Sequence, residues 1–249
     1  MKAVITDLDR TLLRSDKSIS PYTLDVLRRC RQKGMRIMAA SARALRDLKV
    51  YDDLIGFDAI TATNGAVVSL PQSLCETGIP RSCGEKLLAA LVQFPDAVIS
   101  IEAGSGLYSS RDIPAWKPTV YTGFPALPDD TILYKILVSS ENGLLHQSIA
   151  DILTPEVYHT IADGKLIQIM STEATKWSGI QKMLDCFAID PADAIYFGDD
   201  NDDILPLQKC GMGVAVSNAI PAVRKAADCL TDTNDADGVA AFLEDHFLS

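Results

Sequence analysis

Strand-like and helix-like segments alternate along the first part of the chain, and this alternation constrains the fold more than any other feature. An apolar run at residues 3–8 is followed by a helix pattern that opens at Ser20-Pro21, where Ser caps the helix and Pro fits its first turn. Further strand patterns at residues 35–40 and 59–62 are separated by a second helix pattern, and the alternation resumes after residue 172. The sequence therefore predicts an α/β fold, a doubly wound and mostly parallel sheet with helices on both faces.

The pattern changes after about Pro80. Strand pairs joined by hairpins beside helices are typical of a small α+β unit, and one is predicted here as an insertion in the larger fold. The expected elements are helices at 84–94 and 144–153, strands at 98–101, 107–109 and 132–138, and a hairpin of 157–161 with 166–170 that turns at Asp163-Gly164. We therefore expect two domains, one of residues 1–79 with 173–249 and one of residues 80–172.

Composition and charge restrict the class of partner and the compartment. The chain has 249 residues and a formal net charge of −10, which disfavours nucleic acid or an anionic membrane as the main partner. Its 6 cysteines include no Cys-x-x-Cys pair, which fits reduced thiols better than disulfides or a zinc site. The first apolar run meets Asp7 too soon for a signal peptide, and no stretch approaches the length of a membrane span. We expect a cytoplasmic protein, a monomer or small homo-oligomer, whose partner is a small molecule.

Acidic residues follow two of the predicted strands. Asp7 and Asp9 come after the first strand, and Asp199 and Asp203 come after the strand at residues 194–197. In a parallel sheet, ligands bind beyond the carboxyl ends of the strands. Carboxylates that lie close together repel unless a cation or a proton sits between them, and carboxylate oxygens are ligands that Mg²⁺ accepts. Each cluster alone could equally be a solvated turn that caps a helix.

Two other kinds of site fit the sequence poorly. A calcium-binding loop that starts at Asp199 would need Gly where Ile204 stands and Glu where Cys210 stands. A dinucleotide site that starts at Gly211 would need a third glycine where Val216 stands.

Four motifs occur in an order that matches a known family. They are Asp-x-Asp-x-Thr at residues 7–11, Ser-x-Arg at 41–43, Lys176, and Gly-Asp-x-x-x-Asp at 198–203. In this order the chain resembles the haloacid dehalogenase superfamily of phosphohydrolases. The inserted unit and the segment at 214–219 are similar to the Cof-type sugar-phosphatase branch. The resemblance implies a Rossmann-like core interrupted by an α/β cap.

The resemblance also implies roles for the acidic residues and for Lys176. Asp7 would attack phosphorus and become an aspartyl phosphate, and Asp9 would act as the general acid and then the general base. Lys176 would neutralise the phosphoryl charge and orient Asp7. Mg²⁺ would be ligated by Asp7, Asp199 and the backbone carbonyl of Asp9, and Asp203 would orient ligands or waters near the metal.

Other motif residues have weaker assignments. The resemblance implies that Ser41 hydrogen-bonds the transferring phosphoryl group, although Ser41 could instead cap a helix. Asn218 could approach the phosphate or close a turn. Lys176 taken alone could be a solvated surface charge, and Arg43 receives no catalytic role.

The chain departs from the family pattern at four positions. The departures, none of which removes a group that makes or breaks a bond, are Arg10 and Ala42 where Gly is common, Trp177 where Gly is frequent, and Asp202 where Asn is frequent. Arg10 would crowd the site or add positive charge at its mouth. Asp202 would add negative charge near the metal.

The predicted function is Mg²⁺-dependent hydrolysis of a small phosphorylated metabolite, with sugar phosphates among the candidates. The cap would exclude water and read the leaving group. Candidate contacts there are Arg111, Trp116, Lys117 and Lys135. A phosphotransferase or mutase would use the same aspartyl phosphate, and a phosphate-binding module that has lost turnover is a further alternative. The presence of both Asp7 and Asp9 argues against the binding module.

Overall fold

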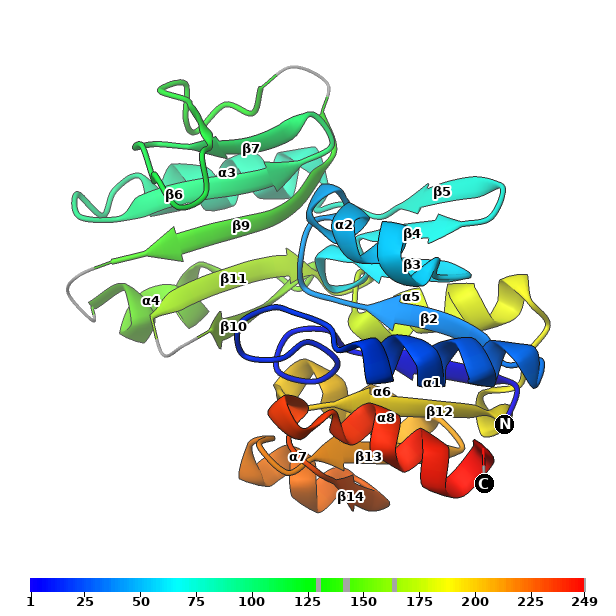
Figure 1. The fold of residues 1–249 in the computed structure, drawn as a ribbon. Helices are drawn as coiled ribbons and strands as arrows, with labels where there is room; N and C mark the ends of the chain where they lie inside the picture. The colour runs from blue at the N-terminus through cyan, green and yellow to red at the C-terminus, as the bar shows by residue number, and fades with distance from the viewer. Residues whose placement is uncertain (129–130, 141–143, 163–164, 249) are drawn as a thin grey trace. The chain divides into compact units, whose positions relative to one another are not determined.

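A computed structural model describes residues 1–128, 131–140, 144–162 and 165–248 (Figure 1). The chain divides into two compact units, which we call the core unit, Met1–Cys75 with Thr175–Ser249, and the inserted unit, Glu76–Ala174. Residues 76–79, predicted as part of the core, group with the inserted unit, where the Ile79 N–H donates to the Leu133 carbonyl at 2.7 Å. Residues 173–174, also predicted as core, group with the inserted unit as well. The predicted turn at 163–164 lies outside the described residues.

The core unit is built on an 8-stranded sheet in the order β14-β13-β12-β1-β2-β3-β4-β5. The strands are β1 Ala3–Thr6, β2 Arg36–Ala40, β3 Ala59–Ala62, β4 Val67–Leu70, β5 Ser73–Glu76, β12 Ala194–Gly198, β13 Met212–Val216 and β14 Cys229–Thr231. Strands β14 through β3 are parallel, and β4 runs antiparallel to β3. The predicted doubly wound α/β core is confirmed.

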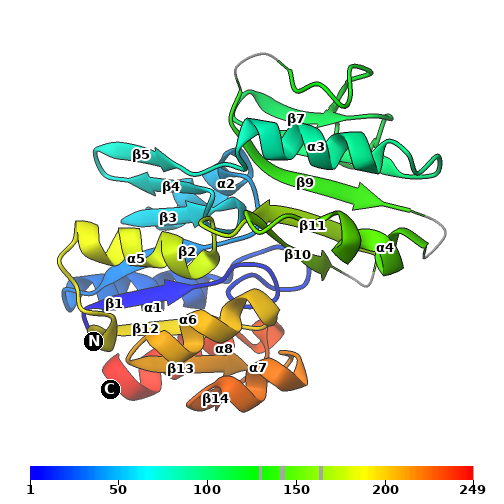
Figure 2. The same cartoon turned by 180° about the vertical axis from the view of Figure 1, so that it is seen from behind.

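Helices cover both faces of this sheet. Figure 1 shows α1 and α8 over one face, and Figure 2, from behind, shows α5 and α6 over the other. The helices are α1 Pro21–Gln32, α2 Leu45–Ile55, α5 Lys176–Cys186, α6 Ile204–Lys209, α7 Pro221–Ala226 and α8 Gly238–Leu243, with 3₁₀ turns η1 Thr63–Gly65, η2 Pro191–Asp193, η3 Asn201–Asp203 and η4 Asn234–Ala236 and a π turn η5 Glu244–Leu248. As predicted, the Ser20 hydroxyl caps α1 and accepts from the Thr23 N–H at 3.0 Å.

Strands β1 and β12 lie side by side at the centre of the sheet. Every residue of both strands is buried, as expected for parallel strands that carry helices on both faces. Their register pairs Thr6 with Phe197, so both strands end at the same edge. The loops that follow them therefore start from neighbouring points.

The inserted unit has its own 6-stranded sheet, in the order β10-β11-β9-β6-β7-β8. Its elements are α3 Arg81–Leu91, β6 Val98–Ala103, β7 Gly106–Ser109, β8 Thr119–Val120, β9 Leu133–Ser139, α4 Leu144–Ile152, β10 Val157–Ala162 and β11 Leu166–Ser171. Its apolar core joins Leu87 and Leu88 of α3 to Ile101 of β6, Ile136 of β9 and Ile169 of β11. This unit has the predicted α+β composition.

Several elements differ from the sequence prediction. Strands β4 and β5 were not predicted. Strand β5, at the edge of the sheet, is largely exposed and lacks the apolar alternation that marks a half-buried strand. Helix α3 begins at Arg81 rather than residue 84, and α8 gives way at Glu244 to the π turn. Within the described ranges, no helix combines the length and apolar character that a membrane crossing requires.

Gly179 allows α5 to pack closely on β3. A Cβ atom at residue 179 would lie 2.0 Å from Oγ1 of Thr61, which is fully buried. We predict that Gly179→Ala lowers the free energy of unfolding by about 1–3 kcal/mol, the usual effect of overpacking a core. Urea denaturation measures this change. Gln181→Ala, at an exposed position of the same helix, is the control and should alter stability little; equal stability of the two variants would contradict the packing argument.

Candidate functional site

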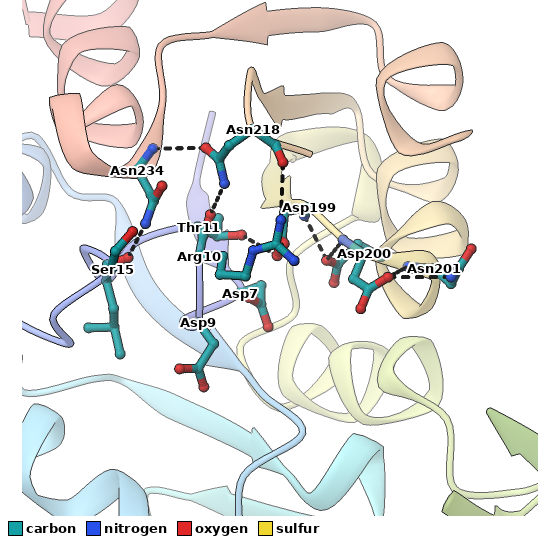
Figure 3. A network of polar contacts seen from close by, with 12 residues as sticks. Asp7, Asp9, Arg10, Thr11, Ser15, Asp199, Asp200, Asn201, Asn218 and Asn234 are labelled. Atoms are coloured by element: carbon teal, nitrogen blue, oxygen red, sulfur yellow. Dashed lines mark hydrogen bonds and ion pairs between the residues drawn. The ribbon is translucent and has the colours of Figure 1, made fainter. Parts of the chain in front are cut away.

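The two acidic loops meet at the carboxyl edge of the core sheet. The Asp7 N–H donates to the Phe197 carbonyl at 2.9 Å and thereby joins the end of β1 to β12. Carboxylate oxygens of Asp7, Asp199 and Asp203 all lie within 4.8 Å of one another, and all three residues are buried. Figure 3 shows Asp7 and Asp9 on the loop after β1, and Asp199 on the loop after β12.

Lys176 lies between two of these carboxylates. It is the first residue of α5, whose N-terminus is capped reciprocally by Thr175 and Ser178. The Lys176 Nζ donates to Asp7 Oδ1 at 2.9 Å and to Asp203 Oδ1 at 2.6 Å, with its side chain only 5% exposed. A cation at a helix N-terminus opposes the helix dipole, so the two carboxylates are needed to hold it there. Burial contradicts the alternative in which Lys176 is a solvated surface charge.

Asp203 accepts four hydrogen bonds. Its Oδ1 accepts from Lys176 and from the Tyr196 hydroxyl, the latter at 2.6 Å. Its Oδ2 accepts from the N–H groups of Asp199 at 2.8 Å and Asp200 at 3.0 Å. Asp203 thus fixes both Lys176 and the loop that carries Asp199, the arrangement expected of a residue that orients the site rather than one that binds a ligand directly.

Burial and neighbouring charges shift the pKa values of this cluster. Burial raises the pKa of the Asp7 carboxyl well above its usual value, and the Lys176 ammonium opposes this. Burial lowers the pKa of Lys176, but the carboxylates of Asp203 and Asp7 outweigh it, and the pKa lies above its ordinary value. Burial, followed by the charge of Asp203, raises the pKa of Asp199 to about 6. The ammonium is therefore charged at neutral pH, in a site that has an excess of carboxylate.

The donor atoms of the cluster fit a hard divalent cation. Asp199 Oδ1 accepts from the Thr11 hydroxyl at 2.9 Å, which fixes the orientation of the carboxylate. Among the described residues, no hydrogen-bond donor approaches Oδ2 of Asp7. Oxygen ligands from two carboxylates are what Mg²⁺ or a similar ion takes from a protein beside its phosphate ligand. Asp7 and Asp199 are therefore the residues that could hold such an ion.

Asp9 occupies a different environment from Asp7. The Arg43 Nε donates to Asp9 Oδ2 at 2.5 Å, the Arg43 Nη2 donates to Oδ1 at 2.7 Å, and the Lys17 Nζ donates to Oδ1 at 2.7 Å. Burial raises the pKa of Asp9, but the hydrogen bonds from Arg43 and Lys17 outweigh it and hold the pKa below its usual value. Arg43, to which the sequence assigned no catalytic role, therefore binds a predicted catalytic residue directly. Its place in the Ser-x-Arg motif was a usable signal, whereas nothing in the sequence marks Lys17.

Ser41 and Asn218 lie at the same edge of the core unit. Ser41 follows β2 with 2% exposure, and its hydroxyl accepts from the Arg43 N–H at 3.2 Å. The Asn218 amide donates to the Arg10 carbonyl at 2.8 Å, and its oxygen accepts from the Asn234 N–H at 3.0 Å. Asn218 thus ties loops together, and contact of either residue with substrate stays a prediction.

The remaining residues singled out from the sequence are Asp202 and the candidate substrate contacts of the inserted unit. Asp202, where Asn is frequent in the family, accepts from the Asn64 amide. Of the candidate contacts in the inserted unit, Arg111, Trp116 and Lys117 are exposed. Lys135 is buried and donates to Gln168 Oε1 at 3.0 Å. None of these contacts identifies a substrate-binding residue.

Comparison with known proteins identifies the family. A model of the haloacid dehalogenase-like hydrolases matches residues 4–243. A 5-amino-6-(5-phospho-D-ribitylamino)uracil phosphatase of Bacillus subtilis is 28% identical over 98% of this chain and 97% of its own. A phosphoglycolate phosphatase of Methanopyrus kandleri is 24% identical over 96% and 94%. The solved phosphatase BT1666 of Bacteroides thetaiotaomicron has a TM-score of 0.85 and 23% identity over 98% and 94%.

The chain belongs to the haloacid dehalogenase-like hydrolases and is a phosphatase of that family. The resemblance stated from the four motifs is confirmed. Members of the family generally use a divalent metal, in agreement with the acidic cluster described above.

The raised pKa of Asp199 makes the stability of the metal-free protein depend on pH. Because the pKa is about 6 in the folded chain and about 4 when unfolded, the folded state binds more protons between these values, and stability falls as pH rises through them. The Asp199→Asn variant should not lose stability in this way, because an amide does not ionise. We predict that, in the presence of chelator, the free energy of unfolding of the variant is about 2–3 kcal/mol higher than that of the wild type at pH 7.5. At pH 4 the difference should be much smaller. Urea unfolding at both pH values tests this, and a difference that does not change with pH would contradict it.

Proposed function

We propose that the protein is a Mg²⁺-dependent phosphomonoester hydrolase that forms an aspartyl phosphate on Asp7. The observation that carries this proposal is the buried contact of the Lys176 ammonium with Asp7, beside the carboxylate of Asp199. One location therefore holds a carboxylate that can attack phosphorus, a fixed positive charge and oxygen ligands for a metal. A structural ion pair alone would not need the additional buried carboxylate.

In the first step, Asp7 attacks the phosphorus atom in line with the leaving group. An Asp7–phosphorus bond forms, the bond from phosphorus to the ester oxygen breaks, and Asp9 gives a proton to the departing alkoxide. In the second step, water attacks phosphorus and gives a proton to Asp9. The Asp7–phosphorus bond breaks, which releases phosphate and restores both carboxyl groups.

Charge neutralisation makes the attack of one anion on another possible. A divalent cation held by Asp7, Asp199 and the backbone carbonyl of Asp9 would neutralise phosphoryl charge and fix the phosphate in position. Lys176 keeps Asp7 oriented and lowers the charge repulsion between the carboxylate and the phosphoryl group. Ser41, at the adjoining end of β2, donates a hydrogen bond to a phosphoryl oxygen in this proposal.

The contacts of Asp9 fit its proposed role as general base better than its role as general acid. Ion pairs with Arg43 and Lys17 favour its carboxylate, which is the form that accepts a proton from water. To donate a proton to the leaving group, Asp9 must first be protonated, and for this it must give up one of these ion pairs. We infer that substrate binding rearranges the ion pairs around Asp9.

The substrate is proposed to be a small phosphate ester. The relatives named above act, by name, on a ribitylaminouracil phosphate and on phosphoglycolate, which share a phosphate on a short carbon chain. A sugar phosphate fits the same description. The inserted unit, residues 80–172 in the sequence-based division, is proposed to cover the site and to read the leaving group.

Removing the nucleophile tests the first step. Asp7→Asn should retain the fold and lose at least about 10³-fold in kcat, because an amide cannot form the acyl phosphate. Release of inorganic phosphate from a panel of esters measures the loss, and circular dichroism checks the fold. Asp53→Asn, at a surface ion pair with Lys49, is the matched control and should retain activity. Full phosphate release by the Asp7 variant would refute the assignment.

Chelation tests the metal. EDTA should abolish phosphate release, and added Mg²⁺ should restore it. The same reaction with an added sugar acceptor separates hydrolysis from phosphotransfer, because a transferase would yield a new sugar phosphate in place of free phosphate. Undiminished turnover in EDTA would show that the carboxylates serve another purpose.

A comparison of two leaving groups tests the proposed role of Asp9 as general acid. A 4-nitrophenolate departs without a proton, whereas an alkoxide requires one. Asp9→Asn should therefore reduce kcat for an alkyl phosphate by about 10²–10⁴-fold and reduce it much less for 4-nitrophenyl phosphate. Equal losses on both substrates would mean that Asp9 positions groups rather than transferring a proton.

A further inference from the structure

Arg10 lies next to the proposed metal site in a backbone conformation that favours glycine. Its φ angle is 63°, in the left-handed region, where the family pattern commonly has Gly. A larger residue keeps this conformation only where the surrounding structure enforces it, and such residues cluster at functional sites. Arg10 is one of the departures that the proposed mechanism does not use.

Hydrogen bonds from distant loops enforce this conformation. The Arg10 carbonyl accepts from the Asn218 side chain at 2.8 Å, and Asn218 in turn accepts from the Asn234 N–H at 3.0 Å. Figure 3 shows Asn218 between Arg10 and Asn234. The Asn234 amide donates to the Leu13 carbonyl at 2.9 Å, which closes the network on the loop that carries Arg10. The Arg10 carbonyl is therefore held by Asn218, which is itself held by the loop that carries Asn234.

The side chain of Arg10 reaches Asp199. Its Nη2 donates to the Asn218 carbonyl at 3.3 Å, and its Nε lies 3.6 Å from Asp199 Oδ2. The other oxygen of Asp199, Oδ1, accepts from the Thr11 hydroxyl. Each oxygen of this carboxylate thus faces a donor of the chain itself. The Asp199 side chain is 4% exposed, whereas that of Arg10 is 52% exposed and borders open solvent.

We propose that Arg10 is an internal competitor of the divalent cation at Asp199 and lowers the affinity of the site for metal. The inference rests on the proposed function, because it concerns the same carboxylate. A cation that binds Oδ2 must displace the guanidinium or share the oxygen with it. The half-exposed side chain of Arg10 has room to move away, whereas Thr11 keeps the carboxylate oriented for the ion.

The size of the effect follows from electrostatics. A divalent ion on Asp199 and a guanidinium a few ångströms away repel each other, even in a medium as polar as water, by an energy equivalent to about a tenfold change in Kd. Removal of the charge at residue 10 should therefore tighten metal binding about tenfold.

Isothermal titration calorimetry with Mg²⁺ and with Mn²⁺, in the absence of substrate, tests the proposal. Arg10→Gln removes the charge but keeps a long polar side chain at the same φ, and its Kd should be about tenfold lower than that of the wild type. Arg10→Lys keeps the charge and should stay within about threefold of the wild type. Arg28→Gln makes the same change in net charge on α1, where Arg28 pairs with Asp25, and should leave Kd unchanged.

The outcomes separate this inference from the proposed function. Equal Kd values for the wild type and Arg10→Gln would overturn the role of Arg10 and leave the metal site intact. The same would follow if Arg10→Lys bound the metal as much more tightly than the wild type as Arg10→Gln does. Binding by none of the proteins would overturn the metal site together with the inference. A gain by Arg28→Gln as large as that of Arg10→Gln would show an effect of net charge alone and would also overturn it.

Discussion

The ammonium of Lys176, buried between Asp7 and Asp203, is the interaction on which the site depends. It joins the first strand, the helix that follows the inserted unit and the loop after β12, which are far apart in the sequence. Buried charges are costly unless each is paired, and here the pairing is complete only when the core sheet is assembled. Breaking one partner would leave a buried charge uncompensated, so the geometry of the site and the fold around it are coupled.

The same cluster carries more carboxylate than cation. Lys176 offsets part of the charge of Asp7 and Asp203, but Asp199 remains close to both, and its pKa rises to about 6. An excess of buried negative charge in the metal-free protein favours binding of a cation. Around Asp9 positive charge is in excess instead, since Arg43 and Lys17 both pair with its carboxylate. The two aspartates of the first motif thus differ in their electrostatics because of neighbours that lie outside that motif.

Sequence reasoning predicted the parts of this arrangement that follow from strand order. Parallel strands end at one edge, so Asp7 and Asp199 could be placed together before any coordinates were known, and the four ordered motifs identified the family. The edge strand β5 lacked an apolar alternation, and both it and β4 were missed. Side-chain pairings such as Lys17 with Asp9 and Tyr196 with Asp203 depend on loop conformation and leave no periodic pattern in the sequence. Contacts with a substrate likewise depend on loop conformation rather than on a periodic sequence pattern.

Chemical trapping of the intermediate tests the central claim most directly. Borohydride reduces an acyl phosphate, so quenching the enzyme with borohydride during turnover should convert the phosphorylated aspartate to homoserine. Peptide mass spectrometry would then locate the change. The account predicts homoserine at Asp7 in the presence of Mg²⁺ and substrate, and none when either is withheld. An unmodified Asp7 beside reduction at another carboxylate would contradict it.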